Sequence, residues 1–523
     1  MTVTDALSVD SGRDGADQQT PVVEPPSIVR RMYRAGLILF GVQFCFLLGL
    51  SVFTYRRFTL GIDFAIFNQA WTQIGTGHLD PMSTIHGVRF IDNHFELIMW
   101  PLALVHLVIH SPFVLLVVQD VALVGLEVVA FTWATALVRR SQLSAAWVVA
   151  IIAGTGVLLL AAPGTYSTVV EDFHFEALAM FFVVFAGFDL WSGRTRRMWV
   201  WVILCLLCGD VGGLYVLGIG LSGMVVRGKR REGLILFVLG AAWVGLISVI
   251  GANQGSNLSS GYAYLAGRTS LPGGFSGLWL VGTGVLTHPA RAWHMATPRA
   301  GTAARYILNG GGFGLFTPWG FAVPLAALGT SMLQYDGIFI GLPFQNVVAV
   351  PFVAFGSAWL VVWLAVRART TAFTALAIAV GVASVLIGVG SSAQRMPTAL
   401  QVNASHGFVS GPDAAALGLA LARTPADAEV VAPLPTVGRF GQRPFVYLLL
   451  DQPGVAAQPV PVSAPTVVVV VDPAIAPDLF PPRKVQVLVD RLEAEGARVL
   501  VSSTGVTALI WHPPPGVTSI RMP

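Results

Sequence analysis

Two segments with the same pattern of ionisable residues are the first candidates for chemistry. The pattern D-x-H-F-E occurs as DNHFE at residues 92–96 and as DFHFE at residues 172–176. In an extended segment alternate side chains point the same way, so the Asp, His and Glu of each copy would converge. Carboxylates and imidazoles together suit a divalent ion, and we hypothesise a metal site at His94 and His174. The alternative is helix capping, since an Asp at a helix N-terminus is stabilising.

A lone carboxylate, Asp63, lies in the apolar segment GIDFAIFNQAW at residues 61–71. Phe64, Phe67 and Trp71 recur with helical spacing, which predicts an amphipathic helix that lies on the bilayer surface and has Asp63 at its start. A carboxylate partly desolvated by aromatic neighbours is suited to act as a general base, because desolvation raises the pKa of a carboxyl group. The alternative role for Asp63 is that of an N-cap or solvated loop residue.

Arginine side chains outside the predicted spans are candidates for binding a phosphate, because a guanidinium can donate two parallel hydrogen bonds to phosphate oxygens. Together with three further acids they form the predicted substrate-binding set. This set is Asp92, Asp172, Asp210, Arg56, Arg57, Arg89, Arg268 and Arg305. For any single arginine, the alternative is a solvated loop position.

The composition places these residues in a membrane protein. Of the 523 residues, 54% are hydrophobic and 11% are charged, which is typical of a chain that folds in a bilayer. The formal net charge is +4, and no nucleic acid is expected as a partner. The three cysteines all lie in apolar runs, which argues against a disulfide framework or a zinc ribbon.

Apolar runs of suitable length predict a polytopic α-helical protein with about eleven transmembrane helices. The predicted spans are 35–54, 113–138, 144–163, 177–192, 198–209, 211–226, 233–251, 303–314, 316–333, 344–366 and 371–391. Residues 95–110 are expected as an interfacial or re-entrant helix, and residues 255–304 as an external stretch. Short clusters of Arg and Lys between the spans mark the cytoplasmic side, so Asp63, Asp172 and Asp210 are expected at the outer face.

The same reasoning gives the domain organisation and the location. Residues 1–28 are polar and without periodicity, as in a disordered cytoplasmic tail. Residues 29–391 form the transmembrane domain, with a large first external loop at 55–112. Short β-branched runs, and one run with helical spacing, predict a small extracytoplasmic α/β domain at 392–523. We therefore expect a multi-pass protein of the plasma membrane with its N-terminus in the cytoplasm.

Four segments in order carry a resemblance to a known family. They are GIDFAIFNQAW, DNHFELIMWPLALVHLVIHSP, EDFHFEALAMFFVVFA and CGDVGGLYVLGIGL. In this order they resemble the bacterial membrane proteins grouped as domain of unknown function 2079, over roughly residues 34–392. That group looks like a branch of the GT-C superfamily of integral-membrane glycosyltransferases.

The resemblance implies a GT-C-like fold and a chemistry. GT-C enzymes take a sugar from a polyprenyl-phosphate donor, invert its anomeric centre, and carry an essential acid in the first external loop. That acid maps onto Asp63, which is followed by Phe64 where many relatives carry a second acid. The resemblance therefore implies Asp63 as the base that deprotonates the acceptor hydroxyl. External arginines, with or without a divalent ion, would stabilise the departing lipid phosphate.

Three functions remain open from the sequence. The first is a glycosyltransferase that moves a sugar from the lipid-linked donor to a cell-envelope glycan, lipid or protein, with membrane lipids as further partners. The second is a transporter or flippase of lipid-linked envelope precursors, which would need polar residues near the middle of the membrane and often shows inverted repeats. The third is a scaffold that presents the C-terminal domain, and it leaves the two D-x-H-F-E copies without a use.

Overall fold

The structure is a computed structural model of the whole chain. It describes residues 27–93, 95–253, 260–272, 274–335, 340–368, 370–401, 409–449, 459–472, 482–503 and 505–521. His94, and all but the last two residues of the predicted tail at 1–28, lie outside the described residues. The chain divides into two compact units, and each combines segments that are far apart in the sequence.

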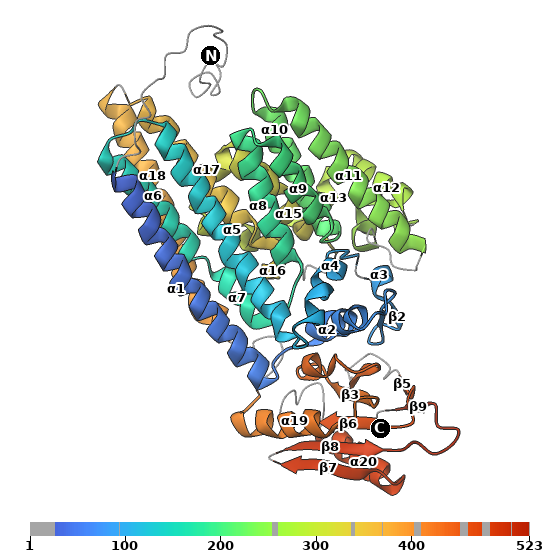
Figure 1. Cartoon of the computed structure of the whole chain (residues 1–523). Coiled ribbons are helices and arrows are strands. Elements are labelled where there is room, and N and C mark those ends of the chain that lie inside the picture. The colour runs from blue at the N-terminus through green and yellow to red at the C-terminus, as the bar shows by residue number, and fades with distance from the viewer. Residues whose placement is uncertain are drawn as a thin grey trace. The chain divides into compact units, whose positions relative to one another are not determined.

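The first unit, of residues 1–43, 122–164 and 176–395, is helical. Its elements include parts of α1 (Ser27–Arg57) and α5 (Phe113–Arg140), followed by α6 (Ala145–Leu160), α8 (Glu176–Ser192), α9 (Thr195–Leu206), α10 (Asp210–Val225), α11 (Arg230–Asn253), η2 (Ser260–Ala266), α12 (Phe275–Thr287), α13 (Pro289–Ala296), η3 (Thr297–Arg299), α14 (Ala300–Asn309), η4 (Phe313–Phe316), α15 (Pro318–Leu333), α16 (Pro343–Asn346), α17 (Ala349–Val366) and most of α18 (Thr371–Ala399). Within this unit α10 packs against α8, α11 and α15, while α17 packs against α6 and α15 (Figure 1).

Six helical segments are long and apolar enough to cross a membrane. They are Ser27–Arg57, Phe113–Arg140, Ala145–Glu171, Arg230–Ile250, Pro343–Val366 and Thr371–Ala399. Shorter apolar helices are α10, α12 and α15. A helical membrane protein is therefore confirmed, and a helix lies at each of the eleven predicted positions, although several are shorter than a bilayer requires.

Two stretches before α15 contain short helices. The stretch 255–304, expected to be external, contains the apolar helix α12, of 13 residues, which is shorter than a membrane span. The span predicted at 303–314 is not one continuous helix. Helix α14 has 10 residues and is followed by glycines at 310–312, two of which have positive φ, so the helix ends there.

The second unit combines residues 44–121, 165–175 and 396–523. It contains the ends of α1 and α18 and the start of α5, and also α2 (Ile62–Gly75), β1 (Met82–Ser83), β2 (Val88–Arg89), α3 (Phe90–Asn93), α4 (Met99–Ala103), η1 (Leu104–Leu107), most of α7 (Pro163–Glu171), α19 (Gly411–Arg423), β3 (Glu429–Pro433), η5 (Val437–Phe440), β4 (Val446–Leu449), β5 (Val460–Pro461), β6 (Val467–Val471), α20 (Pro482–Ala494), β7 (Arg498–Ser503), β8 (Val506–Trp511) and β9 (Ser519–Ile520). Residues 55–112, residues 172–175 of the second D-x-H-F-E copy and the C-terminal domain thus belong to one compact unit.

The C-terminal domain is built on a mixed five-stranded sheet of order β4-β3-β6-β8-β7 (Figure 1). Strands β4, β3 and β6 are parallel, and β8 pairs antiparallel with both β6 and β7. Every residue of the central strand β6 is buried, which explains its uninterrupted run of valine. Helix α19 covers one face of the sheet and α20 the other. A mixed sheet with helices confirms the predicted α/β character of this domain.

Residue 392, where the C-terminal domain was predicted to begin, lies within helix α18. Helix α18 continues to Ala399, and the contacts assign the chain to the second unit only from Met396. The residues 391–395, SSAQR, are helical.

Candidate active site

Asp63 lies in the first turn of α2, as the spacing of apolar residues predicted, but this helix does not offer its apolar face to a bilayer. Phe64, Phe67 and Trp71 are buried within the second unit. The ring of Phe67 contacts Phe173 and Phe175 edge to face, with centroids 5.5 Å and 4.9 Å away. The predicted surface helix is therefore wrong in this respect, because protein covers the apolar side chains that the sequence assigned to lipid.

The N-terminus of α2 is capped by a carboxylate from a distant part of the sequence. The backbone N–H of Gly61, the N-cap residue, donates to Asp172 Oδ2 at 3.1 Å, and the N–H of Phe64 also interacts with this carboxylate. The N–H of Phe173 donates to Asp172 Oδ1 at 3.0 Å. Free N–H groups at the start of a helix are satisfied by such acceptors, so Asp172 fixes where α2 begins.

Gln119 holds the segment that carries Asp172 and His174. This buried side chain donates from Nε2 to the Asp172 carbonyl oxygen at 2.9 Å and accepts from the His174 N–H at 2.7 Å. One carboxamide thereby satisfies two backbone groups of a non-helical segment between α7 and α8. The second D-x-H-F-E copy is therefore held in a fixed conformation by α5.

His174 and Asp63 face each other across this segment. Nδ1 of His174 lies 3.9 Å from Asp63 Oδ2, and the His174 side chain is 4% exposed while that of Asp63 is 37% exposed. Glu171 is close enough to interact electrostatically with both Asp63 and Asp172. We call Asp63, Glu171, Asp172 and His174 the acidic cluster; Asp63 gives it a carboxylate that solvent can reach.

Burial and the carboxylate of Asp63 raise the pKa of Asp172 well above its ordinary value. The hydrogen bonds from the backbone N–H groups of Phe64 and Phe173 lower the pKa of Asp172 but do not cancel this shift. Two carboxyl groups that share a site cannot easily both ionise, so a proton is retained in the buried part of the cluster. Asp63 is the more exposed of the two, with a side chain that is 37% exposed.

The C-terminal domain contacts the start of α2 through η5. Gly438 donates from its N–H to the Leu60 carbonyl oxygen at 3.0 Å, and its own carbonyl oxygen accepts from Asn68 Nδ2 at 3.1 Å. A Cβ atom at Gly438 would lie 2.5 Å from the oxygen of Leu60, and one at Gly441 would lie 2.6 Å from the oxygen of Ala65. The domain is thus fitted backbone to backbone against the segment that carries Asp63.

The first D-x-H-F-E copy has a different environment. Arg89 donates from Nε to Asp92 Oδ2 at 2.8 Å and from Nη2 to Oδ1 at 2.9 Å, and its Nη1 lies 3.8 Å from Asp80. Asp92 and Arg89, predicted to bind substrate, therefore neutralise each other in a bidentate pair. The predicted convergence of Asp, His and Glu does not extend to Asp92, because it lies in the short helix α3 and not in an extended segment.

The other predicted arginines of this unit are at the end of α1. Arg56 is exposed, while Arg57 is partly buried, donates to the Val409 carbonyl oxygen at 3.4 Å and lies 5.1 Å from the ring centre of Phe53. Arg57 therefore holds the segment before α19, whereas the side chain of Arg56 faces solvent.

Asp210, Arg268 and Arg305 belong to the first unit and are described there. Asp210 is the first residue of α10 and lines a cavity of that unit. Arg268 and Arg305 are exposed, on the segment after η2 and on α14 respectively. The predicted substrate-binding set is thus divided between the two units.

The metal hypothesis is only partly covered by the described residues, since His94 lies outside them. Within the described ranges no group of three or more His, Cys, Asp or Glu side chains is arranged to hold a metal ion. His174 is near Asp63 in the acidic cluster instead.

Sequence reasoning missed two residues that matter to this site. Gln119 lies in an apolar run and shows its role only through contacts with residues about 50 positions later. Arg439 of η5 lies against two rings near the start of α2, 4.4 Å from the centre of Tyr55 and 4.2 Å from that of Phe58. Its position in the C-terminal domain, far in sequence from the other candidates, gave no signal.

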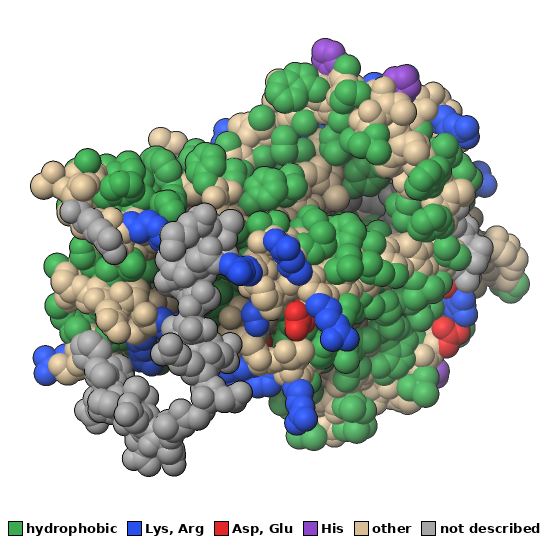
Figure 2. Space-filling view, turned by 90° about the horizontal axis from the view of Figure 1, so that it is seen from above, with side chains coloured by type: hydrophobic (Ala, Val, Ile, Leu, Met, Phe, Trp, Pro, Cys, Tyr) green, Lys and Arg blue, Asp and Glu red, His purple; other side chains and the backbone are tan. Residues whose placement is uncertain are grey.

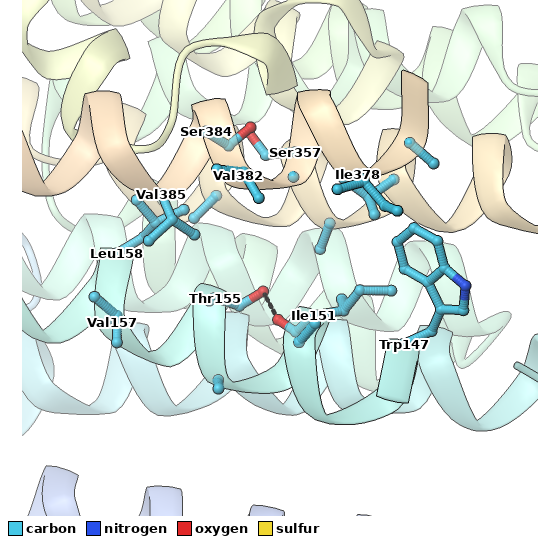
Figure 3. Close-up of a pocket in the computed structure, with 18 of the residues that line it drawn as sticks. Trp147, Ile151, Thr155, Val157, Leu158, Ser357, Ile378, Val382, Ser384 and Val385 are labelled. Carbon is cyan, nitrogen blue, oxygen red and sulfur yellow. Dashed lines mark hydrogen bonds between the residues drawn. The ribbon is translucent and has the colours of Figure 1, made fainter. Parts of the chain in front are cut away.

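A cavity of the first unit is large but offers no chemistry. It has a volume of about 440 Å³ and lies between α6, α17 and α18 (Figure 3). The few hydroxyl groups in its wall bond to the backbone, as Thr155 does to the Ile151 carbonyl oxygen at 2.8 Å. Its lining residues are otherwise apolar or glycine, so this cavity can hold hydrocarbon but cannot transfer a proton or bind a charge.

Comparison with known proteins identifies a family and a distant structural likeness. The family described as "Predicted membrane protein (DUF2079)" matches residues 55–447. Two crystal structures of ArnT from Cupriavidus metallidurans are similar to the chain, each with a TM-score of 0.43 and covering 91% of this chain and 97% of that chain. The sequence identity is 13% for the apo state and 14% for the state bound to undecaprenyl phosphate. None of the curated proteins matches the chain.

Proposed function

The chain belongs to the family of membrane proteins described as DUF2079, and from that premise we propose that it is a GT-C-type glycosyltransferase. It would move a sugar from a polyprenyl-phosphate donor to a cell-envelope acceptor, with inversion at the anomeric carbon. The observation that carries this proposal is the acidic cluster, in which one solvent-accessible carboxylate, Asp63, lies among buried titratable groups.

The cluster supports Asp63 as the general base of the transfer. As the acceptor oxygen attacks the anomeric carbon, its proton passes to an Asp63 oxygen, and the bond between sugar and phosphate breaks with its electron pair on the phosphate. Asp172 and Gln119 fix the backbone around Asp63, so the carboxylate is held in place before substrate binds. A single acid in the loop is sufficient in this scheme, because Glu171, Asp172 and His174 supply the polar surroundings from another segment.

Arg439 is our candidate for stabilising the departing phosphate. Its guanidinium packs against Tyr55 and Phe58, and within the described part of the chain no carboxylate pairs with it. Arg89 is a weaker candidate because Asp92 and Asp80 already neutralise it. A positive charge without an acidic partner is the one that a phosphate would neutralise.

We also propose that the acidic cluster and the C-terminal domain lie on the extracytoplasmic side of the plasma membrane. Arginine pairs or clusters end α5 and begin α9 and α11, and positive charges of this kind mark the cytoplasmic side. On the face shown in Figure 2, Lys and Arg side chains gather among hydrophobic ones, with few acidic side chains. A membrane-impermeant maleimide applied to intact cells tests this orientation, in a background without Cys45, Cys205 and Cys208. It should label a cysteine at the exposed position 80 and not one at the exposed position 196; the reverse result would contradict the orientation.

A transfer assay in membranes tests the function. Membranes that contain the protein are supplied with radiolabelled polyprenyl-phosphate sugars, and label in the acceptor fraction is measured. Asp63→Asn should reduce transfer to background, because the amide cannot accept the proton. The matched control is Asp80→Asn, at an acid of the same loop that is 66% exposed and lies 3.8 Å from Arg89, and it should transfer at the wild-type rate. Transfer retained by Asp63→Asn would remove Asp63 from the mechanism.

A further inference from the structure

A cavity at the start of α10, here called the Asp210 cavity, has no role in the transfer step described above. It has a volume of about 320 Å³ and is lined by residues of α10, α11, α12, α15, α16 and η2, all within the first unit. Near the turn between α10 and α11 the two backbones touch, since a Cβ atom at Gly220 would lie 2.4 Å from Phe237 N. The cavity lies at the opposite ends of these helices, between Asp210 and Ser248.

Among the described residues, the unpaired hydroxyl group of Ser248 favours a polar ligand in this cavity. Ser248 is 3% exposed and lines the cavity. Its Oγ has no hydrogen-bond partner within the part of the chain that the structure describes. A buried hydroxyl without a partner is unfavourable, so an oxygen atom of a ligand that bonds to Ser248 would recover this cost.

The remaining polar lining contains both donors and acceptors. Tyr262 donates to the Thr330 carbonyl oxygen at 3.3 Å, and burial, Asp210 and Tyr264 raise the pKa of Tyr262 to about 12, so its hydroxyl stays protonated. Asp210 and Tyr262 both line the cavity. Gln334 and Gln345 add carboxamides, which both donate and accept.

This set of groups selects the chemistry of the ligand. No lysine or arginine is among the described residues that line the cavity, so a phosphate would find no cation there. The neighbouring Arg299 donates to the backbone carbonyl oxygens of Met332, Gln334 and Tyr335. Its guanidinium therefore stabilises the end of α15. An ammonium group could pair with Asp210. However, an ammonium group accepts no hydrogen bond, so the donor groups of Ser248 and of the carboxamides would stay without an acceptor. The hydroxyl groups of a sugar donate and accept, so they fit both kinds of partner.

Aliphatic side chains complete the cavity. Val244, Leu265, Leu278, Val281 and Val285 form the apolar part of the lining, on helices that include a membrane-spanning one. We infer that the Asp210 cavity binds the sugar headgroup of a glycolipid, with Asp210 and Ser248 bonding to ring hydroxyls and the aliphatic wall contacting the hydrocarbon. This inference rests on the proposed function only in assuming that the protein handles glycolipids.

Photoaffinity labelling of the full chain tests the inference without requiring transfer. The protein is placed in nanodiscs of phosphatidylcholine and phosphatidylglycerol and irradiated with an octyl β-glucoside that carries a diazirine in its alkyl chain, below its critical micelle concentration. Labelled peptides should come from the segments that line the Asp210 cavity. Unlabelled octyl β-glucoside should compete, whereas octyltrimethylammonium and octanol should not.

Variants then connect the label to individual groups. Ser248→Ala should weaken labelling about fivefold, the effect of one neutral hydrogen bond, and Asp210→Asn about tenfold or more, the effect of a bond to a charged group. Thr283→Val is the matched control on α12, because its hydroxyl bonds to the Trp279 carbonyl oxygen of its own helix. Thermal melting checks that each variant is folded.

The outcomes separate this inference from the proposed function. Competition by octyltrimethylammonium, or equal competition by octanol, would overturn a sugar site in favour of an amine site or a hydrocarbon site. Unchanged labelling of a folded Ser248→Ala variant would also overturn it. Asp63→Asn should label like the wild type, so a protein that labels but does not transfer contradicts only the proposed function, and one that transfers but does not label contradicts only this inference.

Discussion

The two D-x-H-F-E copies share a sequence pattern and differ in almost everything that decides chemistry. In the first copy, Asp92 is paired with Arg89, whose side chain is 43% exposed. In the second, Asp172 is buried, caps the helix that carries Asp63, and has that second carboxylate near it. One acid is neutralised near the surface by a cation, and the other is held in a buried cluster of like charge.

The neighbouring side chains, more than the sequence motif, therefore determine whether an acid in this pattern is charged and whether it can accept a proton. A carboxylate beside a guanidinium keeps its charge and is a poor proton acceptor. A buried carboxyl group beside another carboxylate retains its proton, which leaves charge on the more exposed neighbour. Only the second arrangement leaves a carboxylate, Asp63, that can accept a proton. Substitutions in each copy, and in the contacts that position Asp63, therefore compare the two arrangements.

The largest difference should come from removing the acid of each copy. Asp172→Ala deprives the start of α2 of its acceptor, so Asp63 loses its position, and we expect sugar transfer to fall about 100-fold. Asp92→Ala removes a partly buried ion pair with Arg89 that lies outside the acidic cluster, and it should change transfer by no more than about twofold. Transfer rates in membranes, normalised to the amount of protein, measure both. Equal losses in the two variants would mean that both copies serve one site.

Replacing His174 should have a smaller effect. His174 Nδ1 lies 3.9 Å from Asp63 Oδ2, a distance for electrostatic attraction and not for a hydrogen bond, and we expect His174→Gln to lower transfer about tenfold by loosening the position of that carboxylate. The matched control is the exposed His78, for which His78→Gln should have the wild-type rate. A positioning role also predicts a changed dependence of the rate on pH. A His174→Gln variant with an unchanged rate and pH profile would exclude this role.

Disturbing the fit between η5 and the start of α2 should appear mainly in stability. A methyl group at Gly438 or Gly441 would meet backbone oxygen atoms at 2.5 Å and 2.6 Å, so either Gly→Ala change should lower the free energy of unfolding by about 2 kcal/mol. Gly418→Ala is the control, because nothing lies within 4 Å of a Cβ atom there and alanine favours a helix. Thermal melting of the purified protein compares them. Similar melting temperatures for all three variants would show that the contact is loose.

The smallest expected effect is a change in how stability depends on pH. Because the pKa of Asp172 is raised in the folded protein, the stability that its protonated form contributes is complete below its ordinary value of 3.8 and is lost as the pH rises through the raised value. Asp172→Asn cannot titrate, so above about pH 4 its free energy of unfolding should fall less steeply with rising pH than that of the wild type. Unfolding curves across this range give the two slopes. A steeper slope in the variant would reverse the sign assigned to Asp172.

Local patterns predicted the elements of this protein, but not what surrounds them. The spacing of Phe64, Phe67 and Trp71 was enough to predict α2, because a helix of this kind repeats every three to four residues. That Phe173 and Phe175 cover one of those side chains depends on chain packing across more than 100 residues, which periodicity does not contain. The helix was therefore predicted correctly and its environment incorrectly.

The candidate site shows the same division. Asp63, Asp172 and His174 were identifiable by residue type, and the structure brings them together. Arg89 had the same type as any phosphate-binding arginine, and only its distance to Asp92 showed that it is already paired. Gln119 and Arg439 act through contacts between segments far apart in sequence, so no local pattern could identify them.

The most direct test of the account is the sugar-transfer rate of Asp63→Asn and Asp92→Asn measured side by side in the same membranes. The account predicts background transfer for Asp63→Asn and wild-type transfer for Asp92→Asn, with equal amounts of folded protein. Wild-type transfer by Asp63→Asn, or loss of transfer by Asp92→Asn alone, would contradict the proposal that Asp63, positioned by the second copy, is the general base.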